Sequence, residues 1–128
     1  MALRAIRGAT CLSADDPMEM ADAVAELFAE MVDRNQVADD DLVSIILTCT
    51  PDLVSAFPAA AVRRLGFHDV PLMCAQEMNV AGALARVVRV MAHVNSELPR
   101  ADVQHVYLRG AEVLRADLVR HDQPESAP

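Results

Sequence analysis

A glutamate and an arginine stand among apolar residues in the stretch from 71 to 91, PLMCAQEMNVAGALARVVRVM. Glu77 follows a short apolar run, and Arg89 interrupts a run that is rich in valine. Burying a charged side chain costs several kcal/mol unless the charge is paired or has a function. We therefore interpret Glu77 and Arg89, together with Arg7 near the start of the chain, as a candidate site for a small anion.

Length and composition predict one globular domain. The chain has 128 residues, of which 53% are hydrophobic and 23% charged, and a chain of this size buries roughly two thirds of its unfolded surface. We expect the domain to span 1–118 and the polar, proline-containing segment 119–128 to be a flexible tail. No apolar run reaches the roughly 18 residues of a membrane helix. The first residues also lack the apolar core of a signal peptide, so we expect a cytoplasmic protein.

Charge and cysteine usage exclude several classes of function. The net charge of −8 argues against a nucleic-acid-binding surface, which needs clustered cations. Every cation is an arginine and none is a lysine. A GC-rich genome explains that bias. As a consequence, each positive side chain carries a planar guanidinium group, whose forked shape suits carboxylates. Cys11, Cys49 and Cys74 are odd in number and widely spaced, which indicates neither a disulfide framework nor a zinc site.

Hydrophobic periodicity predicts five strands and two helices. Residues 2–12 alternate as a strand that places Leu3, Ala5 and Arg7 on one face. Asp16 and Pro17 have the types found at a helix start, and an apolar stripe then recurs at helical spacing. The expected elements are a helix at 16–35, a buried strand at 42–50, a helix at 57–65, and strands at 70–76, 85–95 and 105–109.

These elements predict an α+β fold, in which a five-stranded mixed sheet carries both helices on one face in the order β-α-β-α-β-β-β. In the strand at 85–95, Arg89 faces away from the apolar side formed by Val88, Val90, Ala92 and Val94. The sheet face without helices would be exposed in a monomer. We therefore expect homo-oligomerisation, with a site between subunits.

Taken one at a time, the candidate residues also have structural explanations. An arginine such as Arg7 also protects edge strands, and a glutamate beside a loop, such as Glu77, is commonly solvated. A lone cysteine in an apolar strand, such as Cys74, usually serves packing, and a buried structural tyrosine with a satisfied hydroxyl, as Tyr107 would then be, is common. We assign two histidines to structure or surface, His93 and His105.

Several motifs occur in order along the chain: IRGAT, TPDL, FPA-AVR, C-QEM, a glycine and a leucine ahead of RVM, and HVYL followed by VLR-DL. Together, over residues 3–118, they resemble the small monofunctional chorismate mutases, which form homotrimers with a pseudo-α/β-barrel fold. The resemblance implies an isomerase that converts chorismate to prephenate without a cofactor or metal. It also implies a place in aromatic amino-acid biosynthesis, in the shikimate-pathway branch towards phenylalanine and tyrosine.

The resemblance implies an active site in a cleft between neighbouring subunits. It puts Arg7, Glu77 and Arg89 at the reacting centre. Around this centre it implies binding residues of three kinds: Cys74 and Tyr107 beside it, Phe57 and Arg63 from the adjacent subunit, and Leu114 and Arg115 at the mouth.

Two positions depart from the family pattern. Ala60 stands where members can carry a lysine near the entrance, which is expected to weaken the attraction of a dianion. Met73, at the wall of the site, stands where a threonine is common, which is expected to alter polar contacts there.

The implied reaction needs no nucleophile and no proton transfer, because one carbon–oxygen bond breaks as one carbon–carbon bond forms. An enzyme can accelerate it by holding the reactive conformer and by stabilising the charge that separates. Two other functions remain open from the residues: a small trimeric enamine or imine deaminase of similar architecture, and a non-catalytic trimer that binds an anionic metabolite.

Overall fold

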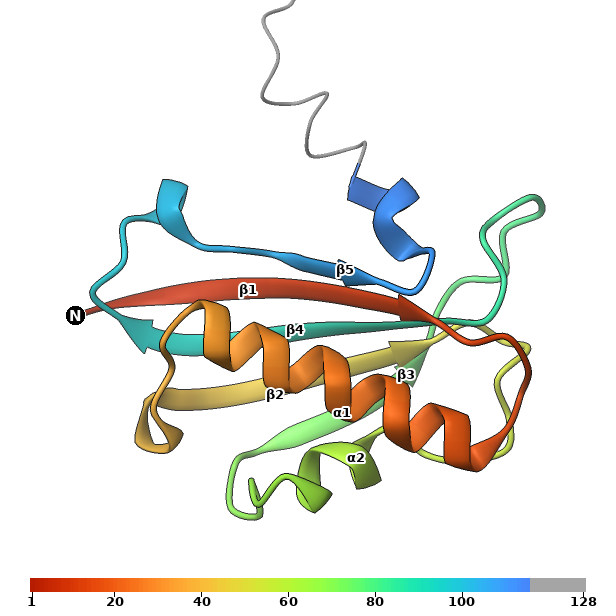
Figure 1. Cartoon of the computed structure of the whole chain (residues 1–128), viewed down its shortest axis with the longest axis horizontal. Helices are drawn as coiled ribbons and strands as arrows, with labels where there is room; N and C mark the ends of the chain where they lie inside the picture. The colour runs from red at the N-terminus through yellow and green to blue at the C-terminus, as the bar shows by residue number, and fades with distance from the viewer. Residues whose placement is uncertain (116–128) are drawn as a thin grey trace, which may run out of the picture.

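Five strands form one mixed sheet, and both helices cover the same face of it (Figure 1). The computed structural model describes residues 1–115, so the predicted tail at 119–128 lies outside the described residues. The element order agrees with the prediction: β1 (Ala2–Cys11), α1 (Pro17–Arg34), β2 (Leu42–Cys49), α2 (Ala59–Arg64), β3 (Leu72–Gln76), β4 (Val87–Ser96) and β5 (Val106–Leu108). No helix among the described residues is long and apolar enough to cross a membrane.

The sheet has the strand order β3-β2-β4-β1-β5, which places β4 at its centre. β4 is antiparallel to both β1 and β2, whereas β3 is parallel to β2 and β5 is parallel to β1. In this register Arg89 of β4 stands opposite Ala9 of β1 and opposite Thr48 of β2. Residues far apart in the sequence therefore meet around Arg89.

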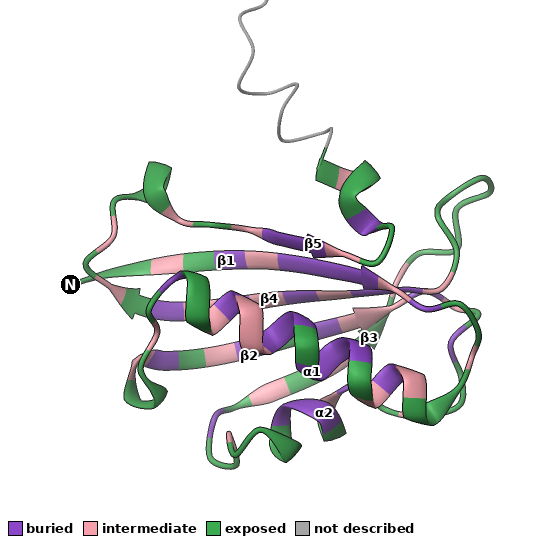
Figure 2. Cartoon of the chain, viewed as in Figure 1, coloured by how far each residue is buried: buried purple, intermediate pink, exposed green. Residues whose placement is uncertain are grey.

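The hydrophobic core lies between the helices and the covered face of the sheet (Figure 2). As predicted, the valine face of β4 is buried there, and the apolar stripe of α1 packs onto it. The stripe residues that are buried are Met20, Val24, Leu27, Phe28 and Met31. The Phe28 ring meets the Phe67 ring edge to face, with the ring centroids 5.2 Å apart.

Side chains cap helix α1 at both ends. The Asp16 carboxylate accepts from the Glu19 N–H at 2.8 Å, and Pro17 occupies the first helical turn, as predicted. At the other end the buried Asn35 amide donates to the carbonyls of Met31 and Gln104 and accepts from the Gln104 N–H, each at 2.8 Å. Asn35 therefore ties the end of α1 to the segment that leads into β5.

Strand β1 comes very close to α1 at Gly8. A Cβ atom on Gly8 would lie 2.5 Å from Sδ of Met31 and 3.1 Å from Cδ1 of Leu27, both of them buried side chains. Real Cβ atoms do not approach other atoms so closely, so glycine is required here for space rather than for its backbone angles. This contact sets how deeply the part of β1 next to Arg7 sits against the helix.

Strand β2 corrects one expectation. The sequence predicts a buried strand at 42–50, whereas only Leu42, Ile45, Leu47 and Thr50 of that range are buried. Val43 is 41% exposed and Ile46 is 36% exposed. An apolar run cannot show whether one face or both faces of a strand will be covered, and here the helices cover one face only.

The other boundaries move by one or two residues for local reasons. β3 begins at Leu72 rather than at Val70 because Pro71 has no N–H to donate, although its carbonyl accepts from the Ile45 N–H at 3.0 Å.

The starts of β4 and α2 and the end of β5 also shift. β4 begins at Val87 because Arg86 has a left-handed φ of 53°, and β5 ends at Leu108 because Arg109 has the same φ. α2 begins at Ala59, with Pro58 as the residue before it, instead of at residue 57.

Candidate active site

Glu77 and Arg89 form an ion pair on the sheet face that has no helices. The Arg89 Nε donates to both carboxylate oxygens of Glu77, at 3.2 Å to Oε1 and 3.1 Å to Oε2. The Thr48 hydroxyl donates to Oε2 at 2.6 Å. The Glu77 side chain is only 16% exposed, whereas the Arg89 side chain is 40% exposed. The carboxylate is therefore largely withdrawn from water and held by two donors.

The main chain also fixes Glu77. Its N–H donates to the Cys49 carbonyl at 2.9 Å, which continues the hydrogen-bond ladder of β2 and β3 one residue beyond β3. The side chain is thereby brought back over Thr48, the neighbour of Cys49 on β2. Arg89 uses only its Nε on Glu77 among the described residues, so its terminal Nη groups remain available to a ligand.

A cavity of about 650 Å³ lies beside this ion pair, lined by residues of β1, β2, β4 and β5 that include Arg7, Thr48, Arg89 and Tyr107. This volume falls in the range of roughly 300–1,000 Å³ that is usual for small-molecule sites. Ala9 of β1 pairs with Arg89 on one side and with Tyr107 on the other. Arg7 lies two residues before Ala9, so strand alternation brings the side chains of Arg7, Arg89 and Tyr107, all predicted site residues, to one face.

Two polar groups of this cavity lack partners within residues 1–115. The Tyr107 hydroxyl is buried without a hydrogen bond. The Arg7 side chain is half-buried, and its guanidinium has neither a hydrogen bond nor an ion pair within the same range, although the Arg7 N–H is bonded to His105. A buried hydroxyl such as that of Tyr107 is nearly always hydrogen-bonded in folded proteins. A bound anion would satisfy both groups.

The lining of the cavity is positive in a chain that is strongly negative overall. Arg7 and Arg89 contribute guanidinium groups, and none of the described residues that line the cavity is an aspartate or a glutamate. The chain as a whole carries a net charge of −8. A concave surface lined by one sign of charge attracts ligands of the opposite sign, so the cavity is suited to an anion.

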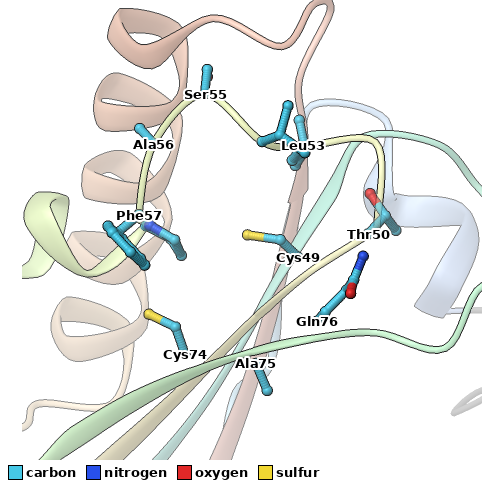
Figure 3. Close-up of a pocket in the computed structure, with 11 residues that line it drawn as sticks. Cys49, Thr50, Leu53, Ser55, Ala56, Phe57, Cys74, Ala75 and Gln76 are labelled. Carbon is cyan, nitrogen blue, oxygen red and sulfur yellow. The ribbon is translucent and has the colours of Figure 1, made fainter.

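A second cavity, of about 550 Å³, lies at the ends of β2 and β3 beneath the loop 53–58 (Figure 3). The sulfur atoms of Cys49 and Cys74 point into it, and Phe57 stands at its rim. Burial raises the pKa of the Cys49 thiol to about 11, with smaller contributions from Cys74 and Glu77. The thiol of Cys49 is therefore protonated at neutral pH and is no nucleophile.

The structure thus separates two groups of predicted site residues within one copy of the chain. Cys74 stands opposite the buried Leu47 of β2, so it faces the helix side of the sheet, away from Arg89. Cys74 and Phe57 line the second cavity, whereas Arg7, Arg89 and Tyr107 line the first.

The remaining predicted binding residues are not among the described residues that line either cavity. Leu114 packs against the small cluster that contains Tyr107, and Arg115 is exposed at the end of the adjoining 3-10 turn, Ala111–Arg115. Arg63 is exposed in the last turn of α2, where its Nη1 donates to the His68 carbonyl at 3.1 Å. Met73 is 60% exposed in β3.

Comparison with known proteins identifies the family. The family model described as chorismate mutase type I matches residues 3–118. The chain belongs to the chorismate mutase type I family.

Relatives and a solved structure support this membership over nearly the whole chain. Chorismate mutase AroH of Thermus thermophilus is 45% identical over 117 residues, which cover 91% of this chain and 96% of that protein. Chorismate mutase AroH of Bacillus subtilis strain 168 is 41% identical over 119 residues, covering 92% and 94%. A chorismate mutase structure from Clostridium thermocellum superposes with a TM-score of 0.84 at 45% identity, covering 85% of this chain and 97% of that one. The family and the α+β fold predicted from the sequence are confirmed.

Two residues of this chorismate mutase family member make contacts beside the candidate site that the sequence does not predict. Thr48 bonds Glu77, but its position becomes meaningful only once the register of β2 against β4 is known. The sequence assigns His105 to structure or surface, and its contact is structural, because its Nδ1 accepts from the Arg7 N–H at 2.9 Å. His105 therefore fastens the start of β5 to β1 at the residue that carries the Arg7 guanidinium.

We expect the His105 contact to make stability depend on pH. Nδ1 must be unprotonated to accept from Arg7, and burial, followed by the positive charges of Arg7 and Arg115, holds the pKa of His105 below its ordinary value of 6.5. The contribution to stability is complete above 6.5, where the unfolded chain is also neutral, and is lost as the pH falls through the lower folded-state pKa.

Urea unfolding of the wild type and a His105→Gln variant between about pH 8 and pH 5 measures this contribution. The free energy of unfolding of the wild type should fall more steeply towards low pH than that of the variant, because carboxylate titration is common to both. Parallel curves would exclude a role for His105 in the pH dependence.

Proposed function

We propose that the chain converts chorismate to prephenate in a single intramolecular rearrangement. The observation that carries the proposal is the Glu77–Arg89 ion pair, set beside a cationic cavity into which Arg7 and Tyr107 bring unpartnered polar groups. Membership of the chorismate mutase type I family supports the same reaction. The residue roles below are part of this proposal.

The charges of the cavity complement a dicarboxylate. Glu77 offsets one guanidinium, that of Arg89, which leaves the charge of Arg7 in the cavity of one copy. An adjacent copy that supplied Arg63 would add a second net positive charge, matching the two carboxylates of chorismate. Arginine suits this role because its planar fork bonds a carboxylate at two points.

Arg89 and Glu77 would act on the charge that separates during the reaction. As the ether bond stretches, negative charge grows on its oxygen, towards which the unpaired Nη groups of Arg89 can donate. Positive character spreads over the ring, where the Glu77 carboxylate can offset it while accepting from the ring hydroxyl. Because Glu77 and Arg89 are already bonded to each other, little reorganisation is needed when the charge develops.

Arg7 and Tyr107 would hold the substrate in its reactive shape. The enolpyruvyl side chain must fold over the ring before the new carbon–carbon bond can form, and most conformers in water are extended. A grip on the side-chain carboxylate by the Arg7 guanidinium and the Tyr107 hydroxyl would fix the folded conformer. Both groups lack other partners within residues 1–115.

We also propose that the active unit is a homotrimer with its sites between subunits. Several large apolar side chains are exposed on the face without helices, among them Leu3, Ile46 and Met73. Phe57, at 78% exposure, projects from the loop before α2, and the cavity that it shares with Cys74 is separate from that of Arg89. If the second cavity of one copy faced the first cavity of a neighbour, Phe57 and Cys74 would lie close to the neighbour's Arg7, Arg89 and Tyr107.

The pathway and location are proposed on the same basis. A prephenate-forming enzyme would serve aromatic amino-acid biosynthesis, and the three cysteines are free, as a reducing cytoplasm would keep them. Ala60 is exposed on α2, so the absence of a lysine there would leave the attraction of the dianion to arginines alone.

The direct test is to incubate the purified protein with chorismate and follow the loss of its ultraviolet absorbance. We expect conversion to prephenate at micromolar enzyme without an added metal or cofactor. No loss of absorbance would reject the mutase function. Binding of chorismate without conversion, measured by calorimetry, would instead indicate a non-catalytic protein, and hydrolysis of an enamine or imine would indicate the deaminase.

Replacing Arg89 should damage turnover more than binding. We expect Arg89→Gln to lower kcat by about 10²–10³, because one preorganised donor to a developing oxyanion is lost, with a much smaller change in KM. Arg89→Lys should recover only part of the loss, since it restores charge without the planar fork. Arg64→Gln is the matched control, because within residues 1–115 the Arg64 guanidinium bonds only the exposed Asp22, at 3.4 Å. Near-normal turnover of Arg89→Gln would remove Arg89 from the mechanism.

The oligomeric state is tested by light scattering coupled to size exclusion. We expect a mass of three times 13.9 kDa for the wild type. Ile46→Asp should give a smaller, folded species, because it puts a charge on the exposed apolar face. The mass is the readout for this variant, since Ile46 also lines the first cavity. Met18→Asp is the control, since Met18 is 76% exposed at the start of α1, on the helix side. A fully active monomer would contradict the intersubunit site.

A further inference from the structure

We propose that Thr48 is a positioning residue that holds the Glu77 carboxylate in its working orientation. This inference deepens the proposed function and rests on it, because it concerns how Glu77 is prepared for the reaction. Thr48 itself need not touch the reacting atoms. Its effect would pass through the hydrogen bond to Glu77.

The bond from Thr48 is the shortest that Glu77 makes among the described residues. The Oγ1 to Oε2 distance is 2.6 Å, which lies in the range of roughly 2.5–2.7 Å found for hydroxyl donors to a charged oxygen. The carboxylate is only 16% exposed, so water competes weakly for the same lone pair. A strong, sheltered bond of this kind can select one rotamer of a flexible glutamate side chain.

Arg89 alone would not fix that rotamer. Its single Nε is shared between the two carboxylate oxygens at 3.2 and 3.1 Å, a geometry that allows the carboxylate to rotate. The Arg89 side chain is itself 40% exposed and would change its contacts when its Nη groups bind a ligand. Thr48 breaks the symmetry, because it bonds only Oε2 and leaves Oε1 with Arg89 as its sole partner in residues 1–115. Oε1 is therefore the oxygen that can accept from a substrate hydroxyl.

The fold makes Thr48 a rigid support. It stands on β2 between the two strands that deliver the other partners, opposite Arg89 of β4 and opposite Ala75 of β3. The carbonyl of the next residue, Cys49, accepts a hydrogen bond from the Glu77 N–H at 2.9 Å. The main chain and the side chain of Glu77 are thus held by consecutive residues of one strand. The branched Cβ of threonine further restricts its χ1 angle.

The test compares three variants in the chorismate assay. Thr48→Val keeps the branched shape and removes the hydroxyl, and we expect kcat to fall by about 10- to 100-fold with KM changed by less than about threefold. Thr48→Ser keeps the donor and should recover most of the loss. Thr10→Val is the matched control, since the buried Thr10 hydroxyl has no hydrogen-bond partner among the described residues, and its kcat should equal that of the wild type.

A double-mutant cycle shows whether Thr48 acts through Glu77. In a Glu77→Gln background, Thr48→Val should lower kcat by less than about twofold, because the carboxylate it positions is gone. A loss that is as large in this background as in the wild type would overturn the proposal. So would a wild-type kcat for Thr48→Val, or a loss that appears only in KM.

A crystal structure of Thr48→Val separates this inference from the proposed function, because it needs no turnover. We expect the main chain unchanged and the Glu77 carboxylate turned or spread over more than one rotamer. If the wild type failed to convert chorismate, the proposed function would fall, while the structure would still decide whether Thr48 positions Glu77. A carboxylate in its original place in Thr48→Val would refute the positioning role.

Discussion

The alternation of side chains along β4 is the constraint on which the rest of the structure depends. One face of this central strand presents Val88, Val90, Ala92 and Val94 to the helices, and the other presents Arg89 to the open side. A strand with a two-residue period cannot move by one position without exchanging these faces. The burial of the valines therefore also fixes where the guanidinium points.

The same rule assembles the rest of the site from distant parts of the chain. Arg7, Thr48 and Tyr107 come from β1, β2 and β5, and the register with β4 brings them around Arg89. The helices pack against the opposite face of the sheet and stabilise this register. β5 is short, and the hydrogen bonds of Asn35 and His105 give it additional contacts with the end of α1 and with β1. A reaction that requires only fixed charges and a fixed substrate shape is well served by such a scaffold, since sheets are more rigid than loops.

Much of the architecture could be predicted because it follows from local patterns. The order of elements, the apolar stripe of α1 and the two faces of β4 all depend on periodicity, and the family followed from motifs spread over the chain. The open face of β2 could not be predicted, because an apolar run has the same composition whether one side or both are covered. The parts played by Thr48 and His105 depend on strand register, and a threonine or histidine has no pattern in sequence that reveals its partner. The separation of Cys74 from Arg89 depends on which side of β3 faces the helices, which again requires the folded sheet.

The close approach at Gly8 has a consequence for how this chain can vary. The space that a methyl group would need at position 8 is filled by the thioether of Met31, which lies on a helix and far away in sequence. Relatives with a larger residue at position 8 should therefore have a shorter side chain at position 31, or a helix α1 that lies farther from β1. Such a shift would displace β1 next to Arg7. Substitutions in the hydrophobic core are therefore coupled to the position of a charged group on the opposite side of the sheet.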